Sequence, residues 1–390
     1  MISFEEALKT VMEAAVSLGS ERVDHVASCG RILAEDIFSD LDMPPFAKAA
    51  MDGFACRMKD IPETLKIIET IPAGKVPLLP IREGECARIM TGAMMPEGAD
   101  CVLKVENTRE EKSGMIRFTG EKTAGNICFQ AEDLRTGEKV LEAGTLIQPA
   151  HIAVMASVGA VRPGVAKLPR IAILSTGDEL VAPWIKPGIS KIRDSNGSQL
   201  MAQAMKVPAC AENLGIAVDD PEILLSEISK GLETHDVLLI SGGVSMGDFD
   251  FVPGILRKAG VEIRIESIAI QPGKPTVFGR KGNHFIFGLP GNPVSSFILF
   301  EVLVKPLLLK MMGSKHLAPE LILPMGKDFF RRSSERMSLV PVRILKGEIF
   351  PIEYHGSAHI HAYTSAHGII ALEQGITEVK KGEPRHVRLL

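Results

Sequence analysis

The stretch DVLLISGGVSMGDFD, residues 236–250, joins an apolar run to a loop of glycines, hydroxyls and acids. Its continuous apolar run, VLLI, predicts a strand that is buried on both faces. The pattern recurs along the chain, in strand-like runs at 170–174 and 284–287 and in helix-like patterns at 198–207 and 220–233. Strands that alternate with helices at this spacing predict a parallel α/β sheet over residues 168–313.

The remaining segments have other patterns. Ser3 and Glu6 form a capping box, which predicts a helix at the start of the chain. From about residue 23 to 166, short apolar runs alternate with Pro and Gly. This pattern predicts mostly β structure with tight turns, apart from a short helix at 151–159. The residues after about 313 carry short β-like runs, which predict a small all-β domain.

Composition excludes several classes of protein. The 390 residues suffice for roughly two to four domains, and 45% hydrophobic with 24% charged residues is typical of globular chains. A formal net charge of −4 without a basic block gives no reason to expect nucleic acid as a partner. The most apolar segment, FILFEVLVKPLLLKMM, is interrupted by Glu301, Lys305 and Pro306, so no membrane span is predicted. The N-terminal segment has acids where a secretion signal needs an apolar core.

The cysteines are widely scattered and form no CxxC pair, so neither a zinc site nor a disulfide framework is predicted. The six are Cys29, Cys56, Cys86, Cys101, Cys128 and Cys210. Reduced thiols in a cytoplasmic protein are therefore expected.

Four loops are predicted to follow strands of the α/β sheet, where ligands of open parallel sheets bind. They are STGDE at 175–179, SGGVSMGDFD at 241–250, QPGKPTV at 271–277 and GLPGNPVSS at 288–296. Each loop alone is explained by an ordinary glycine turn, and neither GxGxxG nor a P-loop is present. Together they supply acids, glycines and Lys274, a combination that suits a phosphate held with Mg²⁺.

Several residues of these loops are candidates for substrate contact. They are Ser175, Thr176, Gly177, Asp178, Ser241, Gly242, Gly243, Ser245, Lys274, Pro290, Asn292 and Pro293. Asp178 and Glu179 are explained equally well as solvated turn acids, and Asn292 as a turn former. Asp250 is a better candidate than Asp248 for an inward-facing carboxylate.

The β-rich half carries a second set of loops. Asp52 precedes Gly53 in a turn signal, Thr91 precedes Gly92 after a predicted strand, and Asp133 lies in a predicted loop. Hairpin tips explain the first two without any function. Each nevertheless places a small polar or acidic residue beside a glycine, as a contact loop would.

Two further features are open to a simple structural explanation. His359 and His361 would share one face of a strand and could then bind a metal, but no acid or cysteine at matching spacing supports this. Trp184, the only tryptophan, lies in APWIKPG and is explained most simply as covering the edge of a loop.

Eight strings of the sequence occur in the order found in the molybdopterin molybdenumtransferase (MoeA) family. They are PPFAKAAMDGFA, RIMTGAMMPEGAD, AEDLRTG, LSTGDEL, DSNG, ISGGVSMGDFD, QPGKPTVFG and GLPGNPVSS. The chain resembles this family over nearly its whole length, and through it the C-terminal region of gephyrin. GLPGNPVS and STGDEL also occur in related molybdopterin-binding domains, so the resemblance depends on the ordered set.

The resemblance implies an α/β plus β multidomain protomer that forms a homodimer. A linker and dimerisation domain of helix and β structure would comprise 1–41 and 137–167, and an inserted β-rich domain 42–136. A parallel α/β molybdopterin-binding domain would follow at 168–316, and a C-terminal β-barrel domain at 317–390. The family's cleft lies between the α/β domain of one subunit and the inserted domain of the other.

The resemblance also implies the reaction. Molybdate would be inserted into adenylyl-molybdopterin with Mg²⁺-dependent release of AMP, and no covalent enzyme intermediate is expected. The positions that match the family's activity-linked residues are Asp52, Thr91, Asp133, Glu179 and Asp250, with Glu179 and Asp250 as metal ligands. Lys274 matches a phosphate-side lysine, and Pro290 and Pro293 a rigid wall. Asp219 and Asp220 match a DD pair, although helix capping explains them well.

The chain departs from the family at two places, because Gln271 and the run Cys128-Phe129-Gln130 stand where many members have positive charge. Two alternatives remain open. A molybdopterin adenylyltransferase would need only the α/β domain, and a scaffold like gephyrin would need a further domain or a long linker. Expected partners are a second copy, the adenylyltransferase, and apo-molybdoenzymes or their chaperones, without nucleic acid or membrane.

Overall fold

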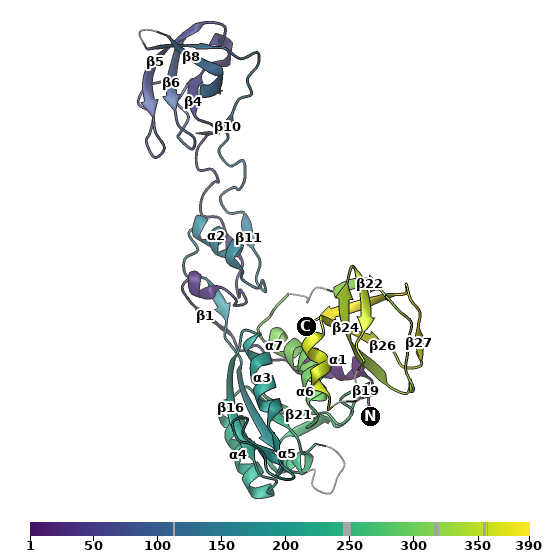
Figure 1. Cartoon of the computed structure of the whole chain (residues 1–390). Coiled ribbons are helices and arrows are strands. Elements are labelled where there is room, and N and C mark those ends of the chain that lie inside the picture. Colours follow the sequence, from purple (N-terminus) through teal and green to yellow (C-terminus); the bar gives the residue numbers. More distant parts are fainter. Residues whose placement is uncertain (112–113, 245–250, 316–319, 354–355, 357) are drawn as a thin grey trace. The chain divides into compact units, whose positions relative to one another are not determined.

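The computed structural model describes residues 1–111, 114–244, 251–315, 320–353, 356 and 358–390 (Figure 1). The chain divides into two compact units. The large unit comprises Met1–Glu35, Ala143–Gln148 and Arg162–Leu390, and the small unit comprises Asp36–Glu142 and Pro149–Val161. The finer division into four domains stays a prediction.

The large unit is built on a six-stranded sheet in the order β16-β13-β17-β21-β20-β18. Its strands are β13 (Arg170–Thr176), β16 (Cys210–Ala217), β17 (Val237–Ser241), β18 (Glu262–Ile265), β20 (Val277–Lys281) and β21 (His284–Leu289). The three apolar runs that predicted strands form β13, β17 and β21, and these pair in parallel with one another in register. The predicted α/β sheet is confirmed at its centre.

The expectation of a wholly parallel sheet is wrong at one edge. β20 runs antiparallel to both β21 and β18. A two-residue turn joins β20 to β21, so no crossover helix is available to make them parallel. Because Val277 lies opposite Gly288, the start of β20 meets the end of β21.

Helices cover both faces of this sheet, which explains why its strands are continuously apolar. Ile173 and Leu239 pack in one buried cluster with side chains of the helices α1 (Phe4–Ala14), α3 (Ser195–Met205), α6 (Pro293–Leu299) and α7 (Lys305–Met311). Their neighbours Leu174 and Leu238 pack in a second cluster with α4 (Pro221–Thr234) and α5 (Val252–Lys258). Successive residues of a strand point to opposite faces, so each strand feeds both cores.

The predicted helix caps of the large unit are confirmed. Ser3 Oγ accepts a hydrogen bond from the Glu6 N–H at 3.1 Å and begins α1. Asp220 caps α4, whose first position is Pro221. The segment after Asn292 is one helical run, in which a π-helical segment, Phe300–Val304, joins α6 to α7. Near the chain start, β1 (Ser20–Arg22) pairs antiparallel with β12 (Gly164–Ala166).

The C-terminal part of the large unit is β structure, as predicted, in the sheet order β19-β24-β26-β28-β22 with β25 beside β24. The strands are β19 (Ile270–Gln271), β22 (Glu320–Pro324), β24 (Met337–Leu345), β25 (Glu348–Pro351), β26 (Gly368–Leu372) and β28 (Pro384–Leu389). A separate pair joins β23 (Phe329–Phe330) to β27 (Glu378–Val379). His359 and His361 do not share a strand face, because the chain forms a 3₁₀ helix at Ile360–Ser365 with His359 at its N-cap.

The position of the QPGKPTV loop also corrects the expectation. It does not follow a strand of the α/β sheet, because Ile270 and Gln271 pair with Met337 and Ser338 of β24. The loop runs from the C-terminal sheet to the start of β20. It still reaches the edge of the α/β sheet where the parallel strands end, which we call the ligand edge. The reason is that β20 is antiparallel and begins where β21 ends.

The small unit is mostly β, as predicted, with a six-stranded sheet in the order β7-β4-β6-β5-β9-β8. The strands are β4 (Gly53–Cys56), β5 (Thr64–Ile71), β6 (Glu85–Ile89), β7 (Cys101–Lys104), β8 (Thr108–Glu111) and β9 (Met115–Phe118). Two short pairs add β3 (Lys48–Ala49) with β10 (Ile127–Cys128) and β2 (Ile37–Phe38) with β11 (Lys139–Leu141). The helix predicted at 151–159 is α2 (Pro149–Ser157).

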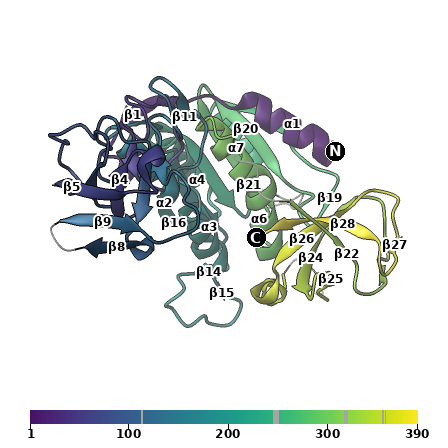
Figure 2. The ribbon, with the colours of Figure 1, turned by 90° about the horizontal axis from the view of Figure 1, so that it is seen from above.

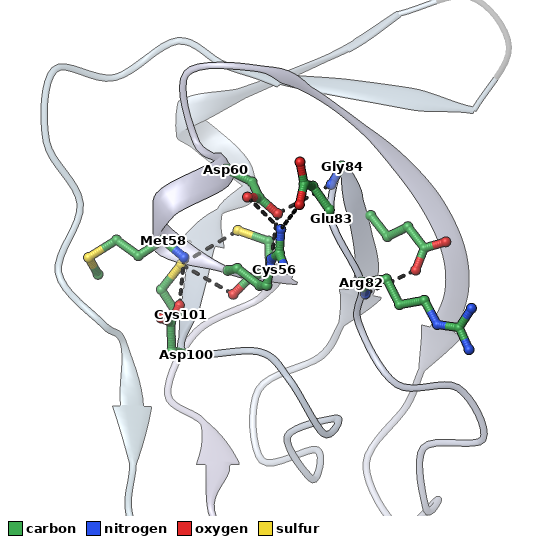
Figure 3. Close-up of polar contacts among 10 residues, drawn as sticks. Cys56, Met58, Asp60, Arg82, Glu83, Gly84, Asp100 and Cys101 are labelled. Carbon is green, nitrogen blue, oxygen red and sulfur yellow. Dashed lines mark hydrogen bonds and ion pairs between the residues drawn. The ribbon is translucent and has the colours of Figure 1, made fainter.

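Three thiols lie side by side in the core of the small unit, because Cys56 pairs directly with Cys86 on one side and with Cys101 on the other. The sulfur atoms of Cys56 and Cys101 are 3.5 Å apart (Figure 3). Next to Cys56 in the sequence, the Arg57 guanidinium forms a bidentate ion pair with Asp60, with nitrogen-to-oxygen distances of 2.7 and 2.9 Å. No disulfide is formed by any of the six cysteines.

Candidate functional site

Two hydroxyls at the end of β13 hold the ligand edge of the α/β sheet together. Ser175 Oγ donates to Asp194 Oδ2 at 2.9 Å, and Thr176 Oγ1 donates to Asp219 Oδ1 at 2.6 Å. Both side chains are buried. Ser175 and Thr176 therefore fix the positions of two acids that sequence reasoning left out of the site or ranked low.

The glycine loop after β17 packs directly against the end of β13. Gly242 has a φ of +104°, and a Cβ there would lie 2.3 Å from the Thr176 carbonyl oxygen. Its N–H donates to the Leu289 carbonyl oxygen at 3.0 Å, which ties the loop to β21. Only glycine allows this close approach of three strand ends. The predicted contacts Ser245 and Asp250 lie outside the described residues.

Asn196 joins the same strand ends from the first turn of α3. Its Nδ2 donates to Ser241 Oγ and to the Gly291 carbonyl oxygen, both at 2.7 Å. The side chain is buried, and its Oδ1 has no hydrogen-bond partner among the residues that the structure describes. Sequence reasoning did not name Asn196, although DSNG was one of the eight strings.

The acids of the STGDE loop lie on the outside of this edge. Asp178 Oδ1 accepts the Asp219 N–H at 3.2 Å, and the Glu179 carbonyl oxygen accepts the Ile192 N–H at 2.8 Å. Both side chains are exposed. Exposed carboxylates are oxygen donors of the kind that Mg²⁺ prefers, so Glu179 fits a magnesium ligand by its chemistry. Within the described ranges, no three His, Cys, Asp or Glu side chains are grouped as a ready metal site.

A cavity of about 450 Å³ lies where the QPGKPTV and GLPGNPVSS loops face the C-terminal sheet. Its lining includes Lys274, Pro290 and Asn292, which the sequence predicted as contacts, and Arg331 and Arg336, which it did not. Pro293, the other predicted wall residue, begins α6 directly after Asn292. The cavity therefore collects three cations beside a proline loop, which suits an anionic ligand.

Backbone oxygens hold the two arginines of the cavity in place. Arg331 donates to the Arg336 carbonyl oxygen at 2.9 Å and to the carbonyl oxygens of Ile376 and Glu373. Arg336 donates to the Ile270 carbonyl oxygen at 3.2 Å. Partial burial lowers the pKa of Arg331 from its ordinary value, but a guanidinium stays charged at neutral pH. No local motif marks either arginine in the sequence.

In the small unit the structure brings Asp52 and Thr91 together. Asp52 Oδ1 accepts the Thr91 N–H at 2.7 Å and the Thr91 hydroxyl at 2.9 Å. These two bonds hold the pKa of Asp52 below its usual value. Asp133 is exposed on another turn, where its N–H donates to the Met43 carbonyl oxygen at 2.9 Å.

Comparison with known proteins assigns the chain to a family. Residues 2–159 match the MoeA N-terminal region (domain I and II), and residues 172–310 match a probable molybdopterin binding domain. A molybdopterin molybdenumtransferase of Staphylococcus epidermidis is 32% identical over 394 residues, which cover 98% of this chain and 94% of that protein. The chain belongs to the MoeA family.

Further relatives agree with this assignment. A molybdopterin molybdenumtransferase of Nostoc sp. is 38% identical over 306 residues, or 75% of this chain and 70% of that protein. The crystal structure of a molybdopterin biosynthesis MoeA protein from Pyrococcus horikoshii superposes with a TM-score of 0.85 at 32% identity, covering 100% of this chain and 99% of the other. Membership of the family makes the chain a transferase of molybdenum cofactor biosynthesis. Within its described part, no helix is long and apolar enough to cross a membrane.

Proposed function

We propose that this MoeA protein inserts molybdate into adenylyl-molybdopterin and releases AMP, with Mg²⁺ as its metal. The observation that carries the proposal is the cavity that collects Lys274, Arg331 and Arg336 beside a rigid proline loop. Both substrates are anions, and cleavage of a phosphoanhydride needs charge neutralisation and alignment more than an activated nucleophile. The cavity supplies the charge, and the strand-end loops supply the alignment.

The residues of the large unit would divide this work between them. Lys274 is exposed at the cavity, whereas Arg331 is fixed by three backbone oxygens. The glycines at 242–243 let the loop after β17 pack closely against Thr176 and Val252, which sets the position of that loop at the strand ends. Ser175 and Thr176 would act on the substrate mainly by holding these loops, since their hydroxyl hydrogens are already donated to acids.

Mg²⁺, when bound, would neutralise charge on the pyrophosphate of the substrate. Glu179 and Asp250 are the residues that we propose to hold it. Asp178 lies next to Glu179 and binds the backbone of Asp219, so it helps to fix the turn that presents Glu179. Asp52 and Thr91 would act as an ionised acid and its fixed donor, and Asp133 as a further acid of the small unit.

The reaction can be tested with purified protein. AMP should be released from adenylyl-molybdopterin only when molybdate and Mg²⁺ are both present, and omission of either should abolish release. Folded protein that releases no AMP under these conditions would contradict the proposal. Parallel assays with molybdate and tungstate would then identify the oxyanion that the enzyme prefers.

Other parts of the expectation also remain proposals. We propose a cytoplasmic homodimer that receives its substrate from the adenylyltransferase and delivers its product to apo-molybdoenzymes or their chaperones. A molybdopterin adenylyltransferase would account only for the α/β part of the chain. The match of residues 2–159 to the MoeA N-terminal region leaves no reason to favour an adenylyltransferase.

A further inference from the structure

The loop between β14 (Leu180–Val181) and β15 (Ile192–Arg193) projects from the large unit beside α3 (Figure 2). We call residues 182–191 the arm. It exposes large apolar side chains, with Trp184 at 85% and Ile189 at 100% of full exposure. The indole therefore does not cover a loop edge, as the sequence suggested. An aromatic side chain of this size that remains in water has its ring face available to a ligand.

The base of the arm is bound to the STGDE loop. The two strands pair in parallel, with Leu180 opposite Ile192. The Ile192 N–H donates to the Glu179 carbonyl oxygen at 2.8 Å, and the Lys191 ammonium donates to the Asp178 carbonyl oxygen. The arm is thus fixed to the residues that carry the proposed magnesium ligand.

Trp184 occupies a defined position near this base. The Ile185 N–H donates to the Ala182 carbonyl oxygen at 2.9 Å, which closes a four-residue turn with Pro183 and Trp184 at its centre. Arg193 Nε donates to the Ile185 carbonyl oxygen at 3.0 Å and holds the turn against β15. Trp184 lies five positions after Glu179, so their Cα atoms are at most about 18 Å apart.

The charge of the arm and its base matches an anionic ligand. Between Leu180 and Arg193 there are three cations, Lys186, Lys191 and Arg193, and no acid, although the whole chain has a formal net charge of −4. Aromatic rings combined with cations bind planar heteroaromatic rings that carry phosphate, because the ring stacks while the cations attract the phosphate.

We propose that Trp184 is a substrate-binding residue whose indole stacks on a planar ring of the adenylylated pterin. This inference rests on the proposed function and extends it to a residue outside the eight strings. The substrate has two such rings, the adenine and the pterin, on either side of its phosphates. The stacking face is fixed to the STGDE loop, which carries the proposed magnesium ligand Glu179. The distance between Trp184 and Glu179 given above suits either ring, and both rings share the same chemistry.

The sole tryptophan makes the inference directly testable by fluorescence. The probes are AMP, 6-hydroxymethylpterin and, as a ligand without a planar ring, ribose 5-phosphate. In each titration the fluorescence is corrected for light absorbed by the ligand, with free N-acetyltryptophanamide as the reference. We expect saturable quenching by the probe whose ring stacks and none by ribose 5-phosphate. Quenching by AMP would show that the indole stacks on the adenine, and quenching by 6-hydroxymethylpterin would show that it stacks on the pterin. If neither ring quenches the emission, the inference is overturned.

Kinetics provide a second readout. Trp184→Ala should raise the KM for adenylyl-molybdopterin by about tenfold or more, with a kcat within about threefold of the wild type. Trp184→Phe should restore most of the binding, because a ring is retained. Ile189→Ala is the matched control, since it removes a fully exposed apolar side chain without a ring from the same arm. A Trp184→Ala enzyme with a KM within twofold of the wild type also overturns the inference.

The two proposals can fail separately. Wild-type protein that releases no AMP contradicts the proposed reaction, and the quenching experiment alone then decides the role of Trp184. Normal AMP release by the wild type and by Trp184→Ala, with the same KM, leaves the reaction standing and removes Trp184 from the site.

Discussion

Asp52 accepts two hydrogen bonds on one carboxylate oxygen from a single residue, with the Thr91 N–H at 2.7 Å and the Thr91 hydroxyl at 2.9 Å. The two residues are 39 positions apart and lie in separate loops. Their contact joins the loop before β4 to the loop after β6. Gly53 follows at once with a backbone so close to β7 that a Cβ would meet the Leu103 carbonyl oxygen at 1.8 Å. The carboxylate is thereby fixed as an ionised, outward-facing group.

Thr91→Val should raise the pKa of Asp52 toward its usual value, because the hydroxyl donor is lost while the N–H remains. A carboxyl whose pKa is lower in the folded chain than in the unfolded chain stabilises the fold at pH values above the unfolded-state pKa. This contribution is lost as the pH falls through the folded-state pKa. The variant should therefore lose part of that stabilisation at neutral pH. Carbon NMR titration of the Asp52 carboxyl measures the shift, and AMP release should fall by about tenfold. Thr91→Ser should behave like the wild type.

Thr136 offers a matched control for this prediction. Its N–H and hydroxyl donate to Asp42 Oδ1 at 2.9 and 3.0 Å, the same arrangement at a place with no proposed role. Thr136→Val should raise the pKa of Asp42 and leave AMP release unchanged. Equal losses of activity in the two variants would show that Thr91 has only a structural role.

Lys274→Ala should weaken binding of the anionic substrate. The ammonium is exposed at the cavity, whereas Lys274 supports the loop through its backbone carbonyl oxygen, which accepts the N–H groups of Ile268 and Thr276 at 3.0 Å. The substitution should raise the KM for adenylyl-molybdopterin about tenfold, and added salt should narrow the difference because it screens exposed charges. Lys281→Ala, at the far end of β20, is the control of equal charge. Identical KM values for the two variants would place the phosphates elsewhere.

The sequence predicted the centre of the fold because its strands are buried on both faces. VLLI at 237–240 and IAIL at 171–174 are apolar at every position, as expected for strands of a sheet that helices cover on both sides. The QPGKPTV loop was misplaced because the pairing that decides its position joins Ile270 to Met337. A two-residue strand that pairs so far along the chain leaves no periodic pattern to detect.

The candidate site was predicted in parts for a related reason. Thr91 and Asp52 were each marked by a neighbouring glycine, but their contact depends on two loops meeting. Arg331 and Arg336 were missed because only short β runs surround them in the sequence. The carbonyl oxygens that hold the two side chains at the cavity are brought near them only by the fold. Trp184 was visible as the sole tryptophan, but its exposure depends on how the arm projects.

Gly242→Ala should destabilise the ligand edge of the α/β sheet. The new Cβ would lie 2.3 Å from the Thr176 carbonyl oxygen, a backbone atom that cannot move without distorting β13. With the added strain of a φ of +104°, we expect a loss of about 2–4 kcal/mol in the free energy of unfolding. Chemical denaturation followed by circular dichroism measures the loss. Gly282→Ala has a positive φ but open space around it, so a loss of only about 1 kcal/mol is expected there. Equal losses would mean that backbone conformation, not the close approach, requires Gly242.

The buried thiols of the small unit should make its stability fall at high pH. Burial raises the pKa of the Cys86 thiol from 9.0 to about 12, since a thiolate cannot be solvated in the core. The hydrogen bond with Cys101, and then burial, raise the pKa of Cys56 as well. Below pH 9 both thiols are neutral whether the chain is folded or unfolded, so they cause no pH dependence there. Above pH 9 the unfolded chain releases the proton first, and the folded state loses roughly 1.4 kcal/mol per pH unit for each thiol until its folded pKa is reached.

Cys86→Ala should therefore lower the stability at pH 7, because a buried group is lost, but flatten its decline between pH 9 and 11. Urea denaturation of the full chain is monitored at several pH values through hydrogen exchange of the amides in β4 and β6. It measures how steeply the stability of the small unit falls with pH. Cys210→Ala, on the exposed start of β16, should leave the slope unchanged. If Cys86→Ala declined as steeply as the wild type, the loss at high pH would have to come from other groups, such as lysines that lose their ion pairs. Alkylation provides an independent measure, because the exposed Cys29 and Cys210 should react in the native state, whereas Cys56, Cys86 and Cys101 should react only after unfolding.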